Sequence, residues 1–214
     1  MTSSSSSIAV RELPLFPLPE VVLFPGRHLP LHVFEFRYRI MMNTILEEDR
    51  RFGVLMVDPV EGGIAKVGCC AEILRFQRLP DDRLKVLTAG QQRFRVLEYT
   101  REKPYRVGLV EWIEDHPPTQ DLRPIAKEVD KLLRDVVHLS AKLTDQKIEL
   151  PNDLPNLATE LSYWVASNLY GVASEQQALL EMQDTFKRLE REIEILTSTR
   201  NHLAARTALK DALK

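Results

Sequence analysis

The tripeptide His116-Pro117-Pro118 separates two halves of the chain that differ in hydrophobic pattern. Before it, apolar residues come in short runs between turn residues, which is typical of β-strands. After it, apolar residues recur every three or four positions, which is typical of amphipathic helices. A single change of period indicates an α+β protein with strands and helices in separate lobes. We therefore predict a disordered lead at residues 1–11, a β lobe at 12–116 and a helical lobe at 117–214.

The β half contains many short strand signals separated by Gly, Pro and Asp turns. Many short strands with few helices indicate a curled or closed sheet. The exception is residues 35–50, where Phe36, Ile40, Met41 and Ile45 have the spacing of one apolar helix face. The predicted strands that we infer from the turn signals cover residues 52–58, 64–68, 71–79, 84–88, 93–99 and 105–112.

Two helices are expected directly after the prolines. Apolar residues spaced by three and four predict the first at residues 121–143. Asp153 has the character of an N-cap for the second, with Pro155 in its first turn and Gly171 at its end. We expect four residues of this second helix to face inward: Leu157, Leu161, Trp164 and Leu169.

A third helix is predicted from Ser174 to near Leu209, because Ser174 and Gln177 have the spacing of a capping box. Burying its apolar stripe contributes about 1.5–3 kcal/mol per side chain, so another surface must cover the stripe. That surface is either the core of the helical lobe or a partner. The stripe consists of Leu179, Met182, Phe186, Leu189, Ile193 and Leu196.

The composition sets limits on location and partners. The formal net charge of the 214 residues is -2, which gives no general attraction to phosphate, so nucleic acid is a disfavoured partner. The only cysteines are the adjacent pair Cys69 and Cys70, which read as reduced, buried thiols and favour the cytoplasm. No apolar run approaches the roughly 20 residues that cross a bilayer, so no membrane partner is expected.

Motifs for catalysis, metal binding and cofactor binding are missing from the sequence. No glycine is followed by lysine, which excludes a Walker-type nucleotide loop. His28 and His32 share strand parity near Glu35, but a metal site needs further ligands, and partly exposed polar neighbours are the simpler interpretation. We therefore expect no catalytic residues, no metal, no cofactor and no enzyme activity.

Residues 72–106 contain nine Lys or Arg and five Asp or Glu, a local balance of 9 - 5 = +4. Such a basic sheet face is one way to bind RNA, and Phe76, Phe94 and Tyr105 would be the stacking aromatics. The simpler interpretation is a solvated sheet face with these three rings in the core or in cross-strand pairs.

Several segments resemble the N-terminal substrate-binding domain of the Lon protease family. The segments of resemblance are residues 13–26, which read LPLFPLPEVVLFPG, residues 28–39, which read HLPLHVFEFRYR, and residues 67–74, 84–97, 174–184 and 188–190. The resemblance implies a PUA-like β lobe followed by a helical lobe. In that family an ATPase module and a protease module come after this domain, and both would lie beyond Lys214, so we expect a stand-alone member.

The resemblance favours a non-catalytic module that binds unfolded or tagged polypeptides, or an adaptor for a protease or chaperone. We select Phe34, Glu35, Phe36, Arg37 and Arg39 as candidate peptide-binding residues, because they mix aromatic and charged groups between a strand and a helix. The alternative for the two phenylalanines is a place in the core. The rival function is a scaffold whose last helix docks to a protease, a chaperone or a second copy of the chain.

Overall fold

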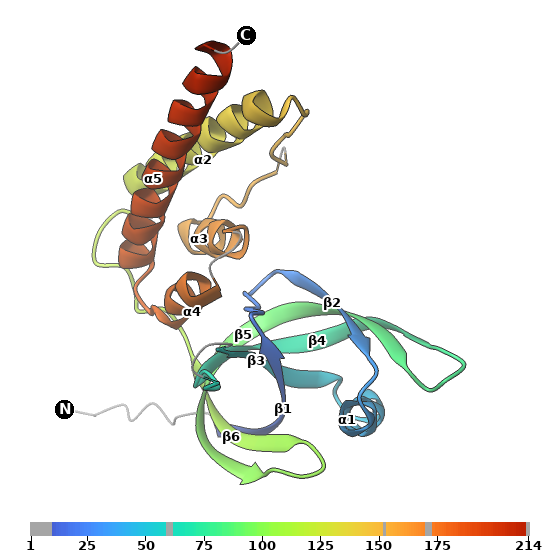
Figure 1. Ribbon diagram of the computed structural model, residues 1–214. Helices are drawn as coiled ribbons and strands as arrows, with labels where there is room; N and C mark the ends of the chain where they lie inside the picture. The colour runs from blue at the N-terminus through green and yellow to red at the C-terminus, as the bar shows by residue number, and fades with distance from the viewer. Residues whose placement is uncertain (1–9, 59–61, 152, 170–172, 213–214) are drawn as a thin grey trace, which may run out of the picture. The chain divides into compact units, whose positions relative to one another are not determined.

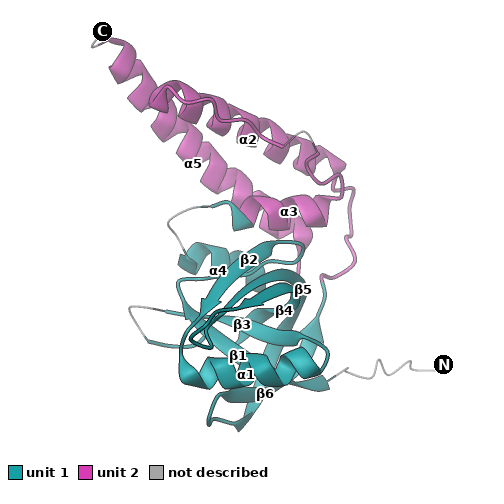
Figure 2. Ribbon diagram, turned by 90° about the vertical axis from the view of Figure 1, so that its right-hand side faces the viewer, with its two compact units in different colours: residues 1–114, 167–181 teal, residues 115–166, 182–214 magenta. Residues whose placement is uncertain are grey.

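The computed structural model describes residues 10–58, 62–151, 153–169 and 173–212. Contacts divide the chain into two compact units, which we call the β unit (residues 1–114 and 167–181) and the helical unit (residues 115–166 and 182–214), coloured separately in Figure 2. The expected α+β class is confirmed by the six-stranded sheet and the five helices among the described residues. No helix of the described residues has the length and apolarity to cross a membrane.

The β unit forms one sheet in the order β2-β5-β4-β3-β1-β6, and β5 also pairs with β6. This second pairing closes β5, β4, β3, β1 and β6 into a ring, with β2 as an edge strand attached to β5. The curled sheet is thereby confirmed. The strands are β1 Val10–Pro19, β2 His28–Val33, β3 Arg51–Val57, β4 Val67–Arg78, β5 Leu84–Arg101 and β6 Arg106–Ile113 (Figure 1).

Strand β5 makes this closure possible because it is long and bent. Its first half pairs with β2, and its second half pairs with β6. Register shifts interrupt its pairing with β4 and β6, and such bulges bend a strand. The two separate strands predicted at residues 84–88 and 93–99 are therefore one strand. The segment between β1 and β2 passes close to β5 at Gly90. A Cβ at Gly90 would come within 2.1 Å of the Phe24 carbonyl oxygen.

Strand β1 begins at Val10, inside the predicted disordered lead of residues 1–11, and pairs with β6 and β3. Residues 1–9 lie outside the described part of the chain, as do residues 59–61 in the first predicted hairpin turn. Arg11 of β1 forms an ion pair with Asp49, which ties the start of the strand to the turn that follows helix α1. This side-chain anchor and the strand pairing explain why residues 10 and 11 belong to a strand.

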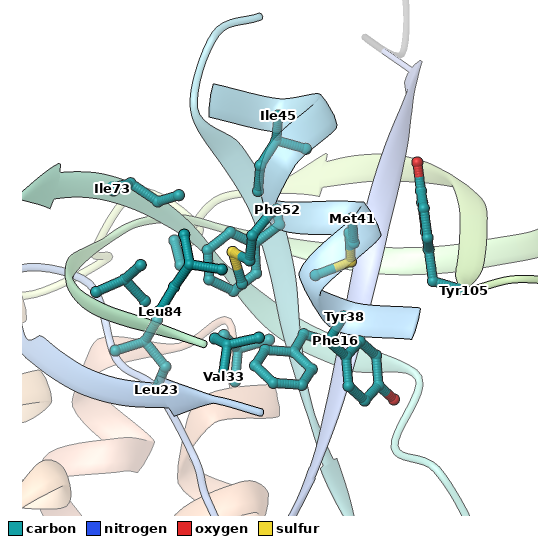
Figure 3. Close-up of a cluster of buried hydrophobic side chains, with 14 of the residues drawn as sticks. Phe16, Leu23, Val33, Tyr38, Met41, Ile45, Phe52, Ile73, Leu84 and Tyr105 are labelled. Carbon is teal, nitrogen blue, oxygen red and sulfur yellow. The ribbon is translucent and has the colours of Figure 1, made fainter. Parts of the chain in front are cut away.

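Helix α1, Phe36–Glu47, covers the larger core cluster of the β unit. Figure 3 shows Tyr38, Met41 and Ile45 directed toward side chains of the sheet, and the rings of Phe16 and Tyr38 have centroids 4.2 Å apart. Met41 and Ile45 are fully buried, as predicted. Phe36 is not: it is the first residue of the helix and is 70% exposed.

Helix α4, Ala173–Glu181, packs on the β unit although it follows helix α3 in the chain. The Gln177 side chain donates to the Val67 carbonyl oxygen at 3.0 Å, and the buried Arg93 of β5 donates to the Leu180 carbonyl oxygen at 2.7 Å. The expected division at residue 117 places this segment in the helical lobe, whereas contacts place it with the sheet. Gln177 therefore anchors the helix to β4.

The helical unit consists of α2 Arg123–Thr144, α3 Ala158–Ser167 and α5 Thr185–Ala212. Helix α2 matches its prediction within two residues. Helix α3 begins after Pro155 rather than around it, and Leu157 is 63% exposed, so neither the Asp153 cap nor an inward Leu157 is observed. The predicted end at Gly171 lies outside the described residues.

The predicted continuous last helix is two helices, α4 and α5, separated at residues 182–184. Asp184 begins the second, because its side chain accepts hydrogen bonds from the backbone N–H groups of Phe186 and Lys187 at 3.0 and 3.2 Å. Leu189 and Leu196 of α5 are buried against α2 and α3 in one core cluster. Much of the stripe is therefore core of the helical unit.

Candidate functional site

The five candidate residues lie at the junction between the end of β2 and the first turn of α1. We call Phe34, Glu35, Phe36, Arg37 and Arg39 the ledge. Phe34 and Phe36 are 62% and 70% exposed, so neither belongs to the core. Exposed phenylalanines this close in sequence form an apolar surface that water solvates poorly.

Both arginines of the ledge lie close to an aromatic ring of helix α1. Arg37 forms an ion pair with Glu35 at 2.8 Å, and its guanidinium lies 4.7 Å from the centroid of the Tyr38 ring. The Arg39 guanidinium lies 5.6 Å from the Phe36 ring centroid and donates to the Asp81 carbonyl oxygen at 3.2 Å. This last bond fixes the ledge to the turn between β4 and β5.

A groove of about 470 Å³ opens beside the ledge. It is lined by residues 30–32 of β2, 85–87 of β5 and 75–77 of β4, which are adjacent strands of one sheet. His32 lines the groove and also makes an edge contact with Phe34, with ring centroids 6.1 Å apart. His32 therefore links the lining of the groove to Phe34 of the ledge.

Sequence reasoning selected the ledge and missed the groove. Phe76 of the groove is 44% exposed and Leu74 beside it is 43% exposed. A register shift between Ile73 and Arg75 breaks the alternation of β4 and exposes these apolar side chains. The only available signal was the run Ile73-Leu74-Arg75-Phe76, whose apolar residues do not alternate as a half-buried strand requires.

Most of the aromatic and basic residues considered for RNA binding are buried in the β unit or form contacts within it. Phe94 is fully buried and Tyr105 is 6% exposed, as the core interpretation predicts, while Phe76 is exposed. Arg93 is buried, and Arg95 pairs with Glu111 at 2.7 Å. Much of the local positive charge is therefore engaged with the protein itself.

Burial makes the two cysteine thiols poor nucleophiles. Cys69 and Cys70 are buried, and burial raises the pKa of Cys69 well above its usual range and that of Cys70 to about 11. Both thiols are protonated at neutral pH, and a protonated thiol is a poor nucleophile. Within the described part of the chain, no three His, Cys, Asp or Glu side chains are placed together to hold a metal ion, which includes His28 and His32.

Comparison with known proteins gives consistent matches. The family of the ATP-dependent protease La (LON) substrate-binding domain matches residues 12–198. A Lon protease of Cytophaga hutchinsonii is 30% identical over 188 residues, which cover 82% of this chain and 23% of that protein. Lon protease 2 of Myxococcus xanthus is 28% identical over 210 residues, which cover 94% of this chain and 25% of that protein. The chain spans about a quarter of the length of these relatives.

Two solved structures share the fold. The crystal structure of a Lon N-terminal domain protein from Xanthomonas campestris has a TM-score of 0.62 and 28% identity, and the match covers 85% of this chain and 96% of that one. The N-terminal domain of a Mycobacterium avium complex Lon protease has a TM-score of 0.65 and 18% identity, with 87% and 98% covered. The chain therefore belongs to the Lon substrate-binding domain family.

Proposed function

We propose that this protein is a non-catalytic recognition module that binds exposed apolar segments of unfolded or tagged polypeptides through the ledge and the adjoining groove. The observation that carries the proposal is the exposure of Phe34 and Phe36 in a chain of a substrate-binding family. Placing a phenylalanine against a partner contributes about 1.5–3 kcal/mol, so two of them supply a useful part of a weak binding energy.

The geometry of the ledge supports this role. Because Arg39 is bonded to the Asp81 carbonyl oxygen and lies over the Phe36 ring, part of the surface is ordered before any partner arrives. An ordered aromatic surface loses less conformational freedom on binding than a mobile one. A bound segment would also reach the groove through His32, which contacts Phe34. Such a module would deliver its polypeptide to a protease or chaperone as an adaptor.

The rival function, docking through the last helix, requires the apolar stripe to be available. Leu189 and Leu196 lie in the core cluster of the helical unit, and both are at most 3% exposed. A partner that used them would have to displace α2 or α3. The exposed ledge requires no such displacement, so the observations favour polypeptide binding there.

Fluorescence anisotropy with a labelled, permanently unfolded polypeptide tests the proposal. We expect binding by the intact protein and at least a tenfold loss, which is about 1.4 kcal/mol, when Phe34→Ala and Phe36→Ala are combined. Leu157→Ala is the control, because Leu157 is equally exposed but belongs to the helical unit. Equal losses in both variants, or ATP or peptide hydrolysis by the purified protein, would contradict the proposal.

A further inference from the structure

The register of three strands defines which side chains face the groove together. Pro30 of β2 is level with Leu87 of β5, and Leu87 is level with Arg75 of β4. Two residues along β5, Lys85 is level with His32. Because side chains alternate along a strand, Pro30, His32, Lys85 and Leu87 lie on the face opposite the buried Val86. On this face the lining combines the apolar Pro30 and Leu87 with the cations Lys85 and Arg75, whereas Phe76, which is level with Val86, lies on the other face.

The charges of the groove are unbalanced. Its lining includes Arg75 and Lys85 and no carboxylate. Both cations are exposed, and neither has an ion-pair partner among the residues that the structure describes. Two acids close in sequence to the groove strands are already engaged: Asp81 pairs with Arg83 at 2.5 Å, and Glu35 pairs with Arg37 at 2.8 Å. A bound segment that carries carboxylates can therefore form ion pairs with Arg75 and Lys85.

We infer that the groove selects a polypeptide segment in which one apolar side chain is flanked by Asp or Glu. The apolar side chain rests on Pro30 and Leu87, and the carboxylates reach Lys85 and Arg75. This inference rests on the proposed function, since it names the class of segment that the same surface binds. A segment flanked by Lys or Arg is repelled, so charge gives this surface a preference that exposed phenylalanines alone do not give.

The test compares two labelled peptides of equal length, each with a central leucine, flanked by glutamates in one and by glutamines in the other. We expect the glutamate peptide to bind the intact protein about tenfold more tightly, as two exposed charge contacts allow, and to lose this advantage as salt is raised. The variant Arg75→Glu/Lys85→Glu should abolish the preference while leaving glutamine-peptide binding within about twofold. Lys66→Glu is the matched control, because Lys66 is an exposed cation of the β unit outside the groove.

Three outcomes decide the inference. A glutamate preference that is lost in the double variant and retained in Lys66→Glu supports it. Equal binding of the two peptides, or equal loss in the double variant and the control, overturns it while the proposed function stands. If neither peptide nor the unfolded polypeptide binds the intact protein, the proposed function fails and the inference fails with it. Circular dichroism of the double variant confirms that its exposed substitutions leave the fold intact.

Discussion

The β unit and the helical unit use charge in different ways. Among the described residues of the β unit, the one charged side chain in the buried set is Arg93, which donates to a helix carbonyl oxygen. The helical unit, by contrast, buries both Arg188 and Glu192 at 0% exposure. The first unit depends on apolar packing and close backbone contacts, which pH does not alter. The second depends on a buried arginine whose charge must stay compensated and on a buried glutamic acid whose pKa is raised by burial, so we expect its stability to depend on pH.

The buried arginine of the helical unit is fully engaged. Arg188 forms an ion pair with Asp115, donates to Ser162 Oγ at 2.8 Å and to the Met182 carbonyl oxygen at 2.7 Å, and lies 4.3 Å from the Tyr163 ring centroid. Asp115 also accepts from Thr185 Oγ1 at 2.6 Å. This network joins the start of the unit to α3 and α5. Its loss should be the most damaging single change in the molecule.

The largest expected effect is that of Asp115→Ala. Removing the carboxylate leaves a buried guanidinium uncompensated, which costs about 3–5 kcal/mol. Urea unfolding followed by Trp164 fluorescence measures it in a Trp112→Phe background, because Trp164 belongs to the helical unit and Trp112 to the β unit. Arg134→Ala is the control: its pair with Asp130 is exposed, so a loss below about 0.5 kcal/mol is expected. Similar losses in the two variants would remove the contrast between the units.

The next effect belongs to the β unit and is steric. In Gly90→Ala the new Cβ would lie 2.1 Å from the Phe24 carbonyl oxygen, so the backbone between β1 and β2 must move. Overpacking of this kind costs about 1–3 kcal/mol. The reporter is Trp112 in a Trp164→Phe background. Gly63→Ala, with nothing within 4 Å of its Cβ, is expected to be nearly neutral. A loss that varied strongly with pH would show that packing is not what limits this unit.

Glu192 gives the third and most diagnostic effect. Burial raises its pKa well above the ordinary value of a glutamic acid, although the charge of Arg188 acts in the opposite direction, and neither carboxylate oxygen has a hydrogen-bond partner. The folded state therefore keeps a proton that the unfolded state releases. Stability is fully present below the unfolded pKa and is lost as pH rises toward the folded pKa, by at most about 1.4 kcal/mol per pH unit.

The test is Glu192→Gln, which cannot ionise. In the Trp164 reporter background we expect the urea midpoint of the intact chain to fall as pH rises above the ordinary glutamate range, and that of the variant to change less. The Trp112 reporter should show no such difference. If the variant and the intact chain lose stability in parallel, another group is responsible for the pH dependence.

The same contrast explains what the sequence could predict. Helix α2 was predicted to within two residues because its apolar stripe repeats without interruption, with its centre at Val129 and Leu132 buried and the residues toward its two ends partly buried. The stripe of the last helix stays in phase across residues 182–184, yet Leu179 is buried in the β unit and Leu189 in the helical unit. The apolar periodicity predicts that a side chain is buried, but it does not predict which part of the protein covers that side chain. Asp184 was the local signal of the new helix, and it is an ordinary N-cap residue.

The candidate site was predictable only where it is local. The ledge is contiguous in sequence, so its mixed aromatic and charged character can be read directly. The groove is not, because Pro30, Leu87 and Arg75 become neighbours only through the pairing of β2 with β5 and of β5 with β4. That register is set by the closure of the whole sheet and by a bulge in β4. The closure of the sheet is not encoded in any run of adjacent residues, and the bulge leaves only the weak local signal of the run at residues 73–76.

The smallest expected effect on stability is that of Phe34→Ala combined with Phe36→Ala. Because both rings are exposed, their removal changes little of the buried area, and we expect the urea midpoint reported by Trp112 to shift by less than the equivalent of about 0.5 kcal/mol. Polypeptide binding should nevertheless fall at least tenfold. A residue that serves packing should instead lose much stability and little polypeptide binding when it is changed, as we expect for Gly90→Ala. If the double variant loses stability and binding in proportion, the ledge is part of the scaffold, and the distinction between a packed unit and its exposed recognition surface no longer holds.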